Sequence, residues 1–166
     1  MLELALPPEA QARELTADAA VIARMRSTLA LQRQSFTVDG PPSAKLRIDR
    51  IDRAIALLVD HQRELCDALA ADYGVRSASQ TLAVDVVSAI EGFKHAKHHL
   101  KHWMRPRKVS PNFPLGWLGS RAEIQAQPIG VVGNIVPWNF PIYLAFGPLA
   151  GILAAGNRSM IKLSEF

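Results

Sequence analysis

The chain has 166 residues, 49% hydrophobic and 20% charged, which suits one globular domain with a sizeable core. No apolar run approaches the ~20 residues of a membrane span, and a single cysteine excludes an internal disulfide framework. The net charge of +4 is uneven, because residues 1–91 carry 10 Lys or Arg against 13 Asp or Glu, whereas residues 92–166 carry 9 against 2.

The N-terminus has no basic region of the kind that opens a secretory signal, so we expect a cytoplasmic protein. Residues 1–17, with two adjacent prolines among small and charged residues, are predicted to form a flexible leader. A first helix is predicted from Asp18, a good N-cap residue, to Phe36, with apolar residues at helical spacing. The run Asp39-Gly40-Pro41-Pro42 ends it.

Two more helices follow. The spacing of Ile, Leu and Gln residues predicts one helix from Ser43 to Tyr73, with Gly74 at the C′ position. Ser77 then opens a third helix that reaches Met104 and stops before Pro106.

The rest of the chain alternates strands and a helix. Residues 105–120 form a connection rich in Pro, Gly and aromatic residues, and residues 121–127 alternate polar and apolar side chains as a strand does. Val131–Val136 is apolar on both faces, as in a buried parallel strand. An apolar helix from Ile142 to Ala155 and a strand from Ser159 to Leu163 complete a βαβ unit.

We therefore predict an α/β protein, in which N-terminal helices precede the start of a Rossmann-like parallel sheet. Ligands of such sheets bind at the carboxyl ends of the strands. Asn139 follows the first strand, while Lys162 and Glu165 lie at the end of the second. An ammonium and a carboxylate together can hold a ribose diol, although a solvated Lys and a helix-start Glu explain the same spacing.

The run Pro137-Trp138-Asn139-Phe140-Pro141 stiffens the loop between strand and helix, because proline fixes φ and restricts the residue before it. A fixed Asn amide can act as a hydrogen-bond donor to an oxyanion. The alternative is that Asn139 caps the next helix.

Four linked motifs resemble the aldehyde dehydrogenase superfamily in order and spacing. They are Gln127-Pro128-Ile129-Gly130-Val131-Val132, Pro137 to Pro141, Ala154-Ala155-Gly156-Asn157 and Lys162-Leu163-Ser164-Glu165. Ala70-Ala71-Asp72-Tyr73-Gly74 also resembles the family's N-terminal region, and the chain looks similar to the coniferyl-aldehyde type. The resemblance covers almost all of this chain but about the first third of a typical member.

The resemblance implies roles for individual residues. It assigns the oxyanion donor to Asn139 and places Trp138 beside the cofactor cleft. Lys162 and Glu165 would bind the adenosine ribose, and Ile135 and Val136 would be further cofactor-binding residues. Glu165 favours NAD, since a carboxylate repels a 2′-phosphate, but NADP stays open. Leu163 departs from the proline that many members have there.

The resemblance also implies a function for a whole family member: NAD(P)-dependent oxidation of an aldehyde to a carboxylic acid by a homo-oligomer. Residues 18–166 would be the N-terminal part of the NAD(P)-binding domain, with a bridging or oligomerisation strand near 121–127. The family's nucleophilic cysteine and general-base glutamate follow the ribose motif. We therefore expect the chain alone to be inactive. The alternatives are a truncated non-catalytic product or a basic-helix binding module.

Three further features are interpreted as structural. Cys66 lies on an amphipathic helix and is expected to be a buried thiol without catalytic function. His95, His98, His99 and His102 share a helix sector without a nearby carboxylate, so we predict a solvated face and no metal site. The Lys and Arg residues between 94 and 108 also have helical spacing, which favours a solvated face over nucleic-acid binding.

Overall fold

The computed structural model describes residues 8–165. Its helical segments are α1 Pro8–Asp39, α2 Ala44–Asp60, α3 Gln62–Tyr73, α4 Ala78–Gln80, the π-helical η1 Thr81–Val87, α5 Ser88–Trp103 and α6 Pro141–Ala154. Its strands are β1 Arg107–Val109, β2 Ala122–Ile124, β3 Val131–Ile135 and β4 Arg158–Lys162.

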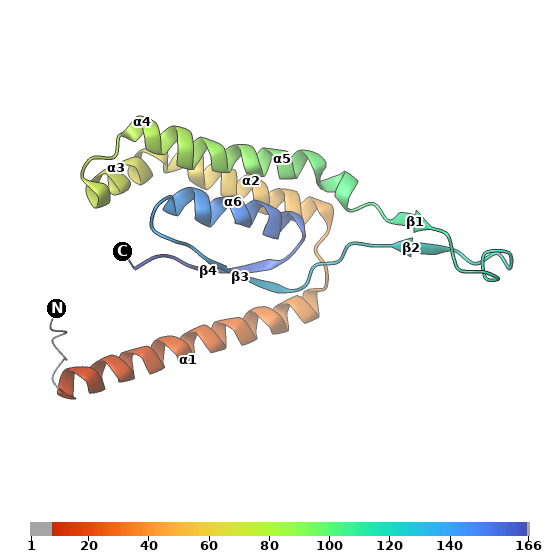
Figure 1. Ribbon diagram of the computed structural model, residues 1–166, viewed down its shortest axis with the longest axis horizontal. Helices are drawn as coiled ribbons and strands as arrows, with labels where there is room; N and C mark the ends of the chain where they lie inside the picture. Colours follow the sequence, from red (N-terminus) through yellow and green to blue (C-terminus); the bar gives the residue numbers. More distant parts are fainter. Residues whose placement is uncertain (1–7, 166) are drawn as a thin grey trace.

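The predicted βαβ unit is present. β3 and β4 pair in parallel, with Val131 opposite Arg158 and Ile135 opposite Lys162, and α6 connects them. Figure 1 shows this sheet between α6 on one side and α1 on the other, with α2 and α5 beyond α6. The α/β class and the helices-then-sheet order of the sequence prediction are therefore confirmed.

The core lies among α2, α5 and α6, away from the sheet. Its large side chains are fully buried: Ile51, Leu58, Phe93 and Leu100 are 0% exposed. Burying one such side chain stabilises the fold by roughly 1.5–3 kcal/mol. Phe93 also meets Phe146 of α6 edge-on at 6.4 Å between ring centroids. The sheet therefore contacts the helical core through α6.

Two helix boundaries differ from the sequence prediction. α1 begins at Pro8, ten residues before Asp18, and so extends over residues 8–17 of the expected flexible leader. Proline suits the first helical position, and the residues that follow it are mostly good helix formers. Residues 1–7 of the predicted leader lie outside the described residues.

The predicted helix over 43–73 is two helices that meet at His61. Ser43 caps α2 as expected, with its hydroxyl accepting from the Leu46 N–H at 3.3 Å. His61, at φ −105° and ψ 12°, then leaves helical geometry and separates α2 from α3. The apolar spacing runs through this break, with Leu58 of α2 and Leu69 of α3 both buried, so periodicity alone does not reveal it. Gly74 ends α3 with φ 69°.

The predicted third helix starts correctly at Ser77, whose hydroxyl accepts from the Gln80 N–H at 3.1 Å. Its second and third turns are the π-helix η1. π-turns often accompany functional sites, and this one carries the buried Asp85 toward α6. Cys66 is 7% exposed, in agreement with its expected structural role, and donates its thiol to the Ala78 carbonyl at 3.7 Å.

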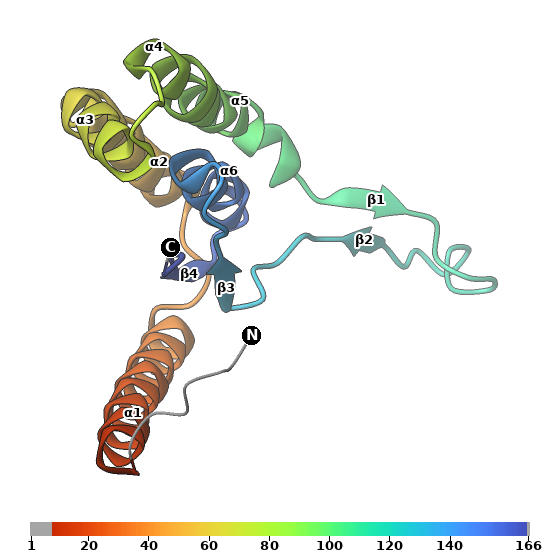
Figure 2. The same cartoon turned by 60° about the vertical axis from the view of Figure 1, so that its left-hand side comes forward.

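The strand predicted over 121–127 is shorter, Ala122–Ile124, and has a partner that the sequence did not reveal. β1 pairs with it antiparallel, with Lys108 opposite Glu123. Figure 2 shows this hairpin extending away from the helices. Three residues rich in positive charge give no strand periodicity, so β1 looked like part of the connection.

β3 is not apolar on both faces as predicted, because its buried residue is Asn134. That side chain donates from Nδ2 to the carbonyls of Leu144 and Ala145 at 3.3 and 3.0 Å. Pro148 lies inside α6 and has no N–H, so it cannot donate to the Leu144 carbonyl four residues earlier. Asn134 therefore satisfies an acceptor that the proline leaves without its helical partner.

We expect Asn134→Ala to lower the free energy of unfolding by about 2–3 kcal/mol, because two buried carbonyl contacts are lost. In a Pro148→Ala background the restored N–H can serve Leu144, so the cost should fall by about 1 kcal/mol. Urea denaturation followed by far-UV circular dichroism measures both values. Asn112→Ala, in the exposed connection, is the matched control. Equal costs in the two backgrounds would contradict this account.

The end of α6 is fixed by a turn and a buried arginine. Gly156 adopts φ +88°, and Asn157 accepts the Gly130 N–H on its side-chain oxygen at 3.0 Å. Arg47, 5% exposed, donates to the carbonyls of Pro42 and Ala154 at 2.9 and 3.0 Å. Burial lowers the pKa of its guanidinium, and nearby Arg50 acts in the same direction. A cation at a helix C-terminus is favourably placed.

Candidate functional site

The loop that carries Asn139 leaves β3 at the same edge at which β4 ends. The Val136 N–H donates to the Lys162 carbonyl at 2.9 Å, which extends the parallel pairing by one step. Asn139 lies three residues farther along and is exposed. Both segments thus reach the carboxyl edge of the sheet, where ligands of α/β proteins bind.

The N-terminus of α6 is capped without Asn139. The N-cap residue is Phe140, which makes no side-chain cap, and Pro141 follows at the first helical position. The carboxylate of Asp85, from η1, accepts the Tyr143 N–H at 3.0 Å. A carboxylate at a helix N-terminus also interacts favourably with the helix dipole. The helix-cap alternative for Asn139 is therefore wrong, because Asp85 does this from another segment.

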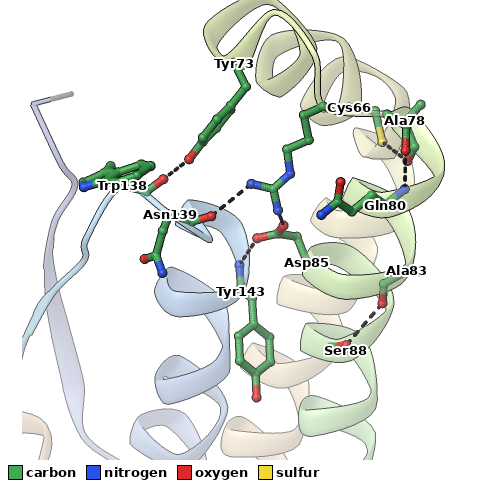
Figure 3. Close-up of polar contacts among 12 residues, drawn as sticks. Cys66, Tyr73, Ala78, Gln80, Ala83, Asp85, Ser88, Trp138, Asn139 and Tyr143 are labelled. Carbon is green, nitrogen blue, oxygen red and sulfur yellow. Dashed lines mark hydrogen bonds and ion pairs between the residues drawn. The ribbon is translucent and has the colours of Figure 1, made fainter.

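Three side chains hold the backbone of the loop (Figure 3): Tyr73 at the end of α3, Arg76 in the connection between α3 and α4, and Asp85 in η1. The Tyr73 hydroxyl donates to the Trp138 carbonyl, and Arg76 Nη1 donates to the Asn139 carbonyl at 3.0 Å. Arg76 Nη2 forms an ion pair with Asp85 whose two side chains are 7% and 0% exposed. The side-chain amide of Asn139 has no hydrogen-bond partner within the described part of the chain.

Lys162 and Glu165 lie at the end of β4 and form an exposed ion pair with each other. The hydrogen bond donated by the Lys162 ammonium, together with its charge, lowers the pKa of the Glu165 carboxyl from the ordinary 4.5. A lowered pKa means that the pair is present above the ordinary pKa and is lost as the pH falls through the lowered one. At neutral pH the Lys162 ammonium is therefore a hydrogen-bond donor and the Glu165 carboxylate an acceptor at this edge.

We expect Lys162→Ala to raise the pKa of Glu165 back toward 4.5, since both causes of the shift reside in that ammonium. An NMR titration of the Glu165 side-chain carboxyl measures it. Lys94→Ala is the matched control, because Lys94 pairs with Glu91 on α5. An unchanged Glu165 titration in Lys162→Ala would refute the pairing.

The other predicted cofactor residues differ in their accessibility. Ile135 and Trp138 are 82% and 55% exposed, so each presents apolar surface to solvent, whereas Val136 is 2% exposed. Neighbouring residues of a strand face opposite sides, so Ile135 and Val136 cannot both face a ligand. The structure places Val136 in the interior, and this placement gives no support to a cofactor contact from it.

The histidine and lysine face of α5 is exposed, as predicted, and several of its side chains contact one another or nearby carboxylates. His99 stacks on Trp103 at 5.6 Å between ring centroids and lies 4.2 Å from His95 by the same measure. Lys94 pairs with Glu91, and Lys97 pairs with Asp52 of α2. Between residues 8 and 165, no three His, Cys, Asp or Glu residues lie close enough to hold a metal ion.

Among the helices of residues 8–165, none has both the length and the apolar character that a membrane span requires.

Sequence reasoning missed Tyr73, Arg76 and Asp85 as parts of this site. The available signal was Asp85 itself, a single carboxylate within the apolar run Val84-Asp85-Val86-Val87. A buried charge usually has a partner, but the sequence does not say which one.

Comparison with known proteins gives one family. The family described as "Aldehyde dehydrogenase family" matches residues 19–166. A probable coniferyl aldehyde dehydrogenase of Caulobacter vibrioides is 50% identical over 144 residues, which are 86% of this chain and 30% of that protein. The coniferyl aldehyde dehydrogenase of a Pseudomonas species is 45% identical over 142 residues.

Solved structures of aldehyde dehydrogenases also match this chain. AldH of Staphylococcus aureus, in a substrate-bound state, superposes with a TM-score of 0.77 at 25% identity, over 85% of this chain and 30% of that one. A benzaldehyde dehydrogenase of Corynebacterium glutamicum, described as NAD-dependent, gives a TM-score of 0.71 at 26% identity, over 84% and 29%. The chain spans about 30% of the length of these relatives.

Proposed function

The chain belongs to the aldehyde dehydrogenase family, and from this premise we propose that it serves NAD(P)-dependent oxidation of an aldehyde to a carboxylic acid. The relatives at 50% and 45% identity are a probable coniferyl aldehyde dehydrogenase and a coniferyl aldehyde dehydrogenase, which favours an aromatic aldehyde as the substrate. The observation that carries the proposal is the free Asn139 amide at the sheet edge where Lys162 ends β4.

In this proposal Asn139 donates its side-chain amide to the aldehyde oxygen as that oxygen gains negative charge. A donor that is already fixed costs no reorganisation when the charge develops, and one such donor typically contributes ~10²–10³ in rate. The loop geometry supports this assignment, because the amide is exposed and Asp85 performs the capping that would otherwise occupy it.

The residues at the end of β4 fit a nicotinamide dinucleotide. We propose that Lys162 donates to the ribose hydroxyls and that Glu165 accepts from them, since a diol offers both an acceptor and a donor. Ile135 and Trp138 would lie against the cofactor with their exposed apolar surfaces. The cofactor supplies the hydride acceptor when it is bound. The Glu165 carboxylate favours NAD over NADP by repelling a 2′-phosphate.

A chimera tests the proposal. This chain replaces the matched N-terminal segment of the Pseudomonas coniferyl aldehyde dehydrogenase. The formation of NADH and of the carboxylic acid from coniferyl aldehyde is then measured by chromatography, because the conjugated aldehyde itself absorbs in the near ultraviolet. We expect a kcat within about tenfold of the parent, because the exchanged segments are 45% identical over 142 residues.

The result is interpreted against the chain alone and against the folding of the chimera. The 166-residue chain alone is expected to form no NADH, since it corresponds to only about 30% of the length of its relatives. A chimera that unfolds at the parent's temperature and retains the parent's oligomeric state, yet forms no NADH, would refute the proposed function.

A further inference from the structure

We propose that Arg76, Asp85 and Tyr73 are positioning residues that fix the direction of the Asn139 amide. They form a clamp, meaning these three side chains acting together on the backbone of residues 138–143. The catalytic meaning of the clamp rests on the function proposed above for Asn139, but its geometry does not.

The clamp holds the loop on both sides of Asn139. The Trp138 carbonyl accepts from Tyr73 and the Asn139 carbonyl accepts from Arg76. The Tyr143 N–H, at the start of α6, donates to Asp85. Because consecutive carbonyls and the following helix are all held, the backbone at Asn139 has little freedom to rotate. Figure 3 shows its side-chain amide directed away from Asp85, on the opposite side from the held carbonyl.

Arg76 suits this task by its shape. One guanidinium nitrogen reaches Asn139 while the other reaches Asp85, which a single ammonium cannot reproduce with the same fork. The guanidinium carbon also lies 5.0 Å from the Tyr73 ring centroid and 5.1 Å from that of Phe140. The two aromatic faces therefore hold the plane of the guanidinium, and through it the carbonyl that it contacts.

Asp85 links the clamp to the helix. Its two carboxylate oxygens serve different partners, with Oδ2 on Arg76 and Oδ1 on the Tyr143 N–H. The side chain is 0% exposed, so both interactions are protected from water. By capping α6 from η1, Asp85 removes the need for a local cap and leaves the Asn139 amide available.

The first experiment reads the Asn139 side chain directly in the full 166-residue chain. The sequence contains four asparagines, so labelling with [¹⁵N]asparagine gives few side-chain amide signals, and Asn139→Asp identifies the one sought. We expect Arg76→Lys, which keeps the charge, to shift the Asn139 side-chain signals. The signals of Asn112 should stay unchanged.

The second readout is hydrogen exchange of the Tyr143 N–H. Asp85→Asn keeps an oxygen acceptor but loses the charge, and we expect exchange at Tyr143 to become tenfold or more faster. Asp52→Asn is the matched control, because it breaks the ion pair of Asp52 with Lys97 between α2 and α5, away from the loop. Its exchange at Tyr143 should equal that of the unmodified chain.

If loss of the buried ion pair between Arg76 and Asp85 unfolds the chain, the Tyr73→Phe variant still tests the clamp. It removes only the hydroxyl on the Trp138 carbonyl and keeps the ring under Arg76. With Trp103 and Trp117 replaced by Phe, Trp138 is the remaining tryptophan, and its emission should shift. Unchanged Asn139 signals in Arg76→Lys, or unchanged Trp138 emission in Tyr73→Phe, would overturn the proposal.

These readouts are independent of enzymatic activity. If Asn139 proves dispensable for NADH formation in the chimera while Arg76→Lys still moves its amide, the proposed function fails and the clamp stands. If the amide does not move but Asn139 is essential, the clamp fails and the function stands.

Discussion

Gly156→Ala is expected to lower the free energy of unfolding by about 3–5 kcal/mol, by combining backbone strain with displacement of a buried, hydrogen-bonded cation. Gly156 has φ +88°, where an L-residue is strained. A Cβ there would lie 2.6 Å from Arg47 Cζ and 2.8 Å from its Nε. Arg47 cannot withdraw without losing the carbonyls of Pro42 and Ala154.

Urea denaturation at neutral pH measures this loss, and Gly151→Ala, inside α6 and five residues before the turn, is the matched control. Nothing lies within 4 Å of a Cβ at Gly151, so that substitution should stabilise the chain by about 0.5–1 kcal/mol. In an Arg47→Met background, Gly156→Ala should cost less, because the steric part is gone. A cost below about 1 kcal/mol, or one that is independent of Arg47, would contradict this explanation.

The sequence predicted most of the secondary structure because its signals are local. Ser43 and Ser77 mark helix starts, Gly74 and Gly156 mark helix ends, and the βαβ unit has a recognisable length. Each of these signals depends on residues within a few positions of one another, which periodicity and capping rules can read.

What the sequence did not reveal depends on contacts between distant positions. Arg76 lies 63 residues before Asn139, and Asp85 lies 58 residues before Tyr143, so neither pair leaves a periodic pattern. Arg47, 107 residues before its acceptor Ala154, looked like one more charge on an amphipathic helix. Charged residues on helices are usually solvated, and only tertiary structure distinguishes the buried ones.

The residues of the candidate site also differ in whether local sequence signals revealed them. The Pro-bracketed loop identified Asn139, because proline restricts the backbone in a way that sequence reveals. Whether the amide caps α6 or stays available depended on Asp85, which the sequence did not connect to this loop. Exposure also separated Ile135 from Val136, which the family resemblance had assigned together.

Asn139→Ala in the active chimera is expected to lower kcat with coniferyl aldehyde by ~10²–10³, because the transition state loses a fixed hydrogen-bond donor. The KM for NAD should change little, since Asn139 does not belong to the residues proposed to hold the ribose. Steady-state kinetics with each substrate varied in turn measures both parameters, and a loss confined to kcat indicates an interaction made mainly in the transition state.

The Asn139→Asp variant distinguishes the loss of the hydrogen-bond donor from the loss of side-chain packing. The carboxylate has nearly the shape of the amide, but it brings a negative charge where negative charge develops, so we expect a kcat no higher than that of Asn139→Ala. Asn112→Ala, in the exposed connection, should leave kcat unchanged. If Asn139→Ala kept more than about a tenth of the kcat, the amide would not be the oxyanion donor. The clamp around its backbone would then serve α6 rather than catalysis.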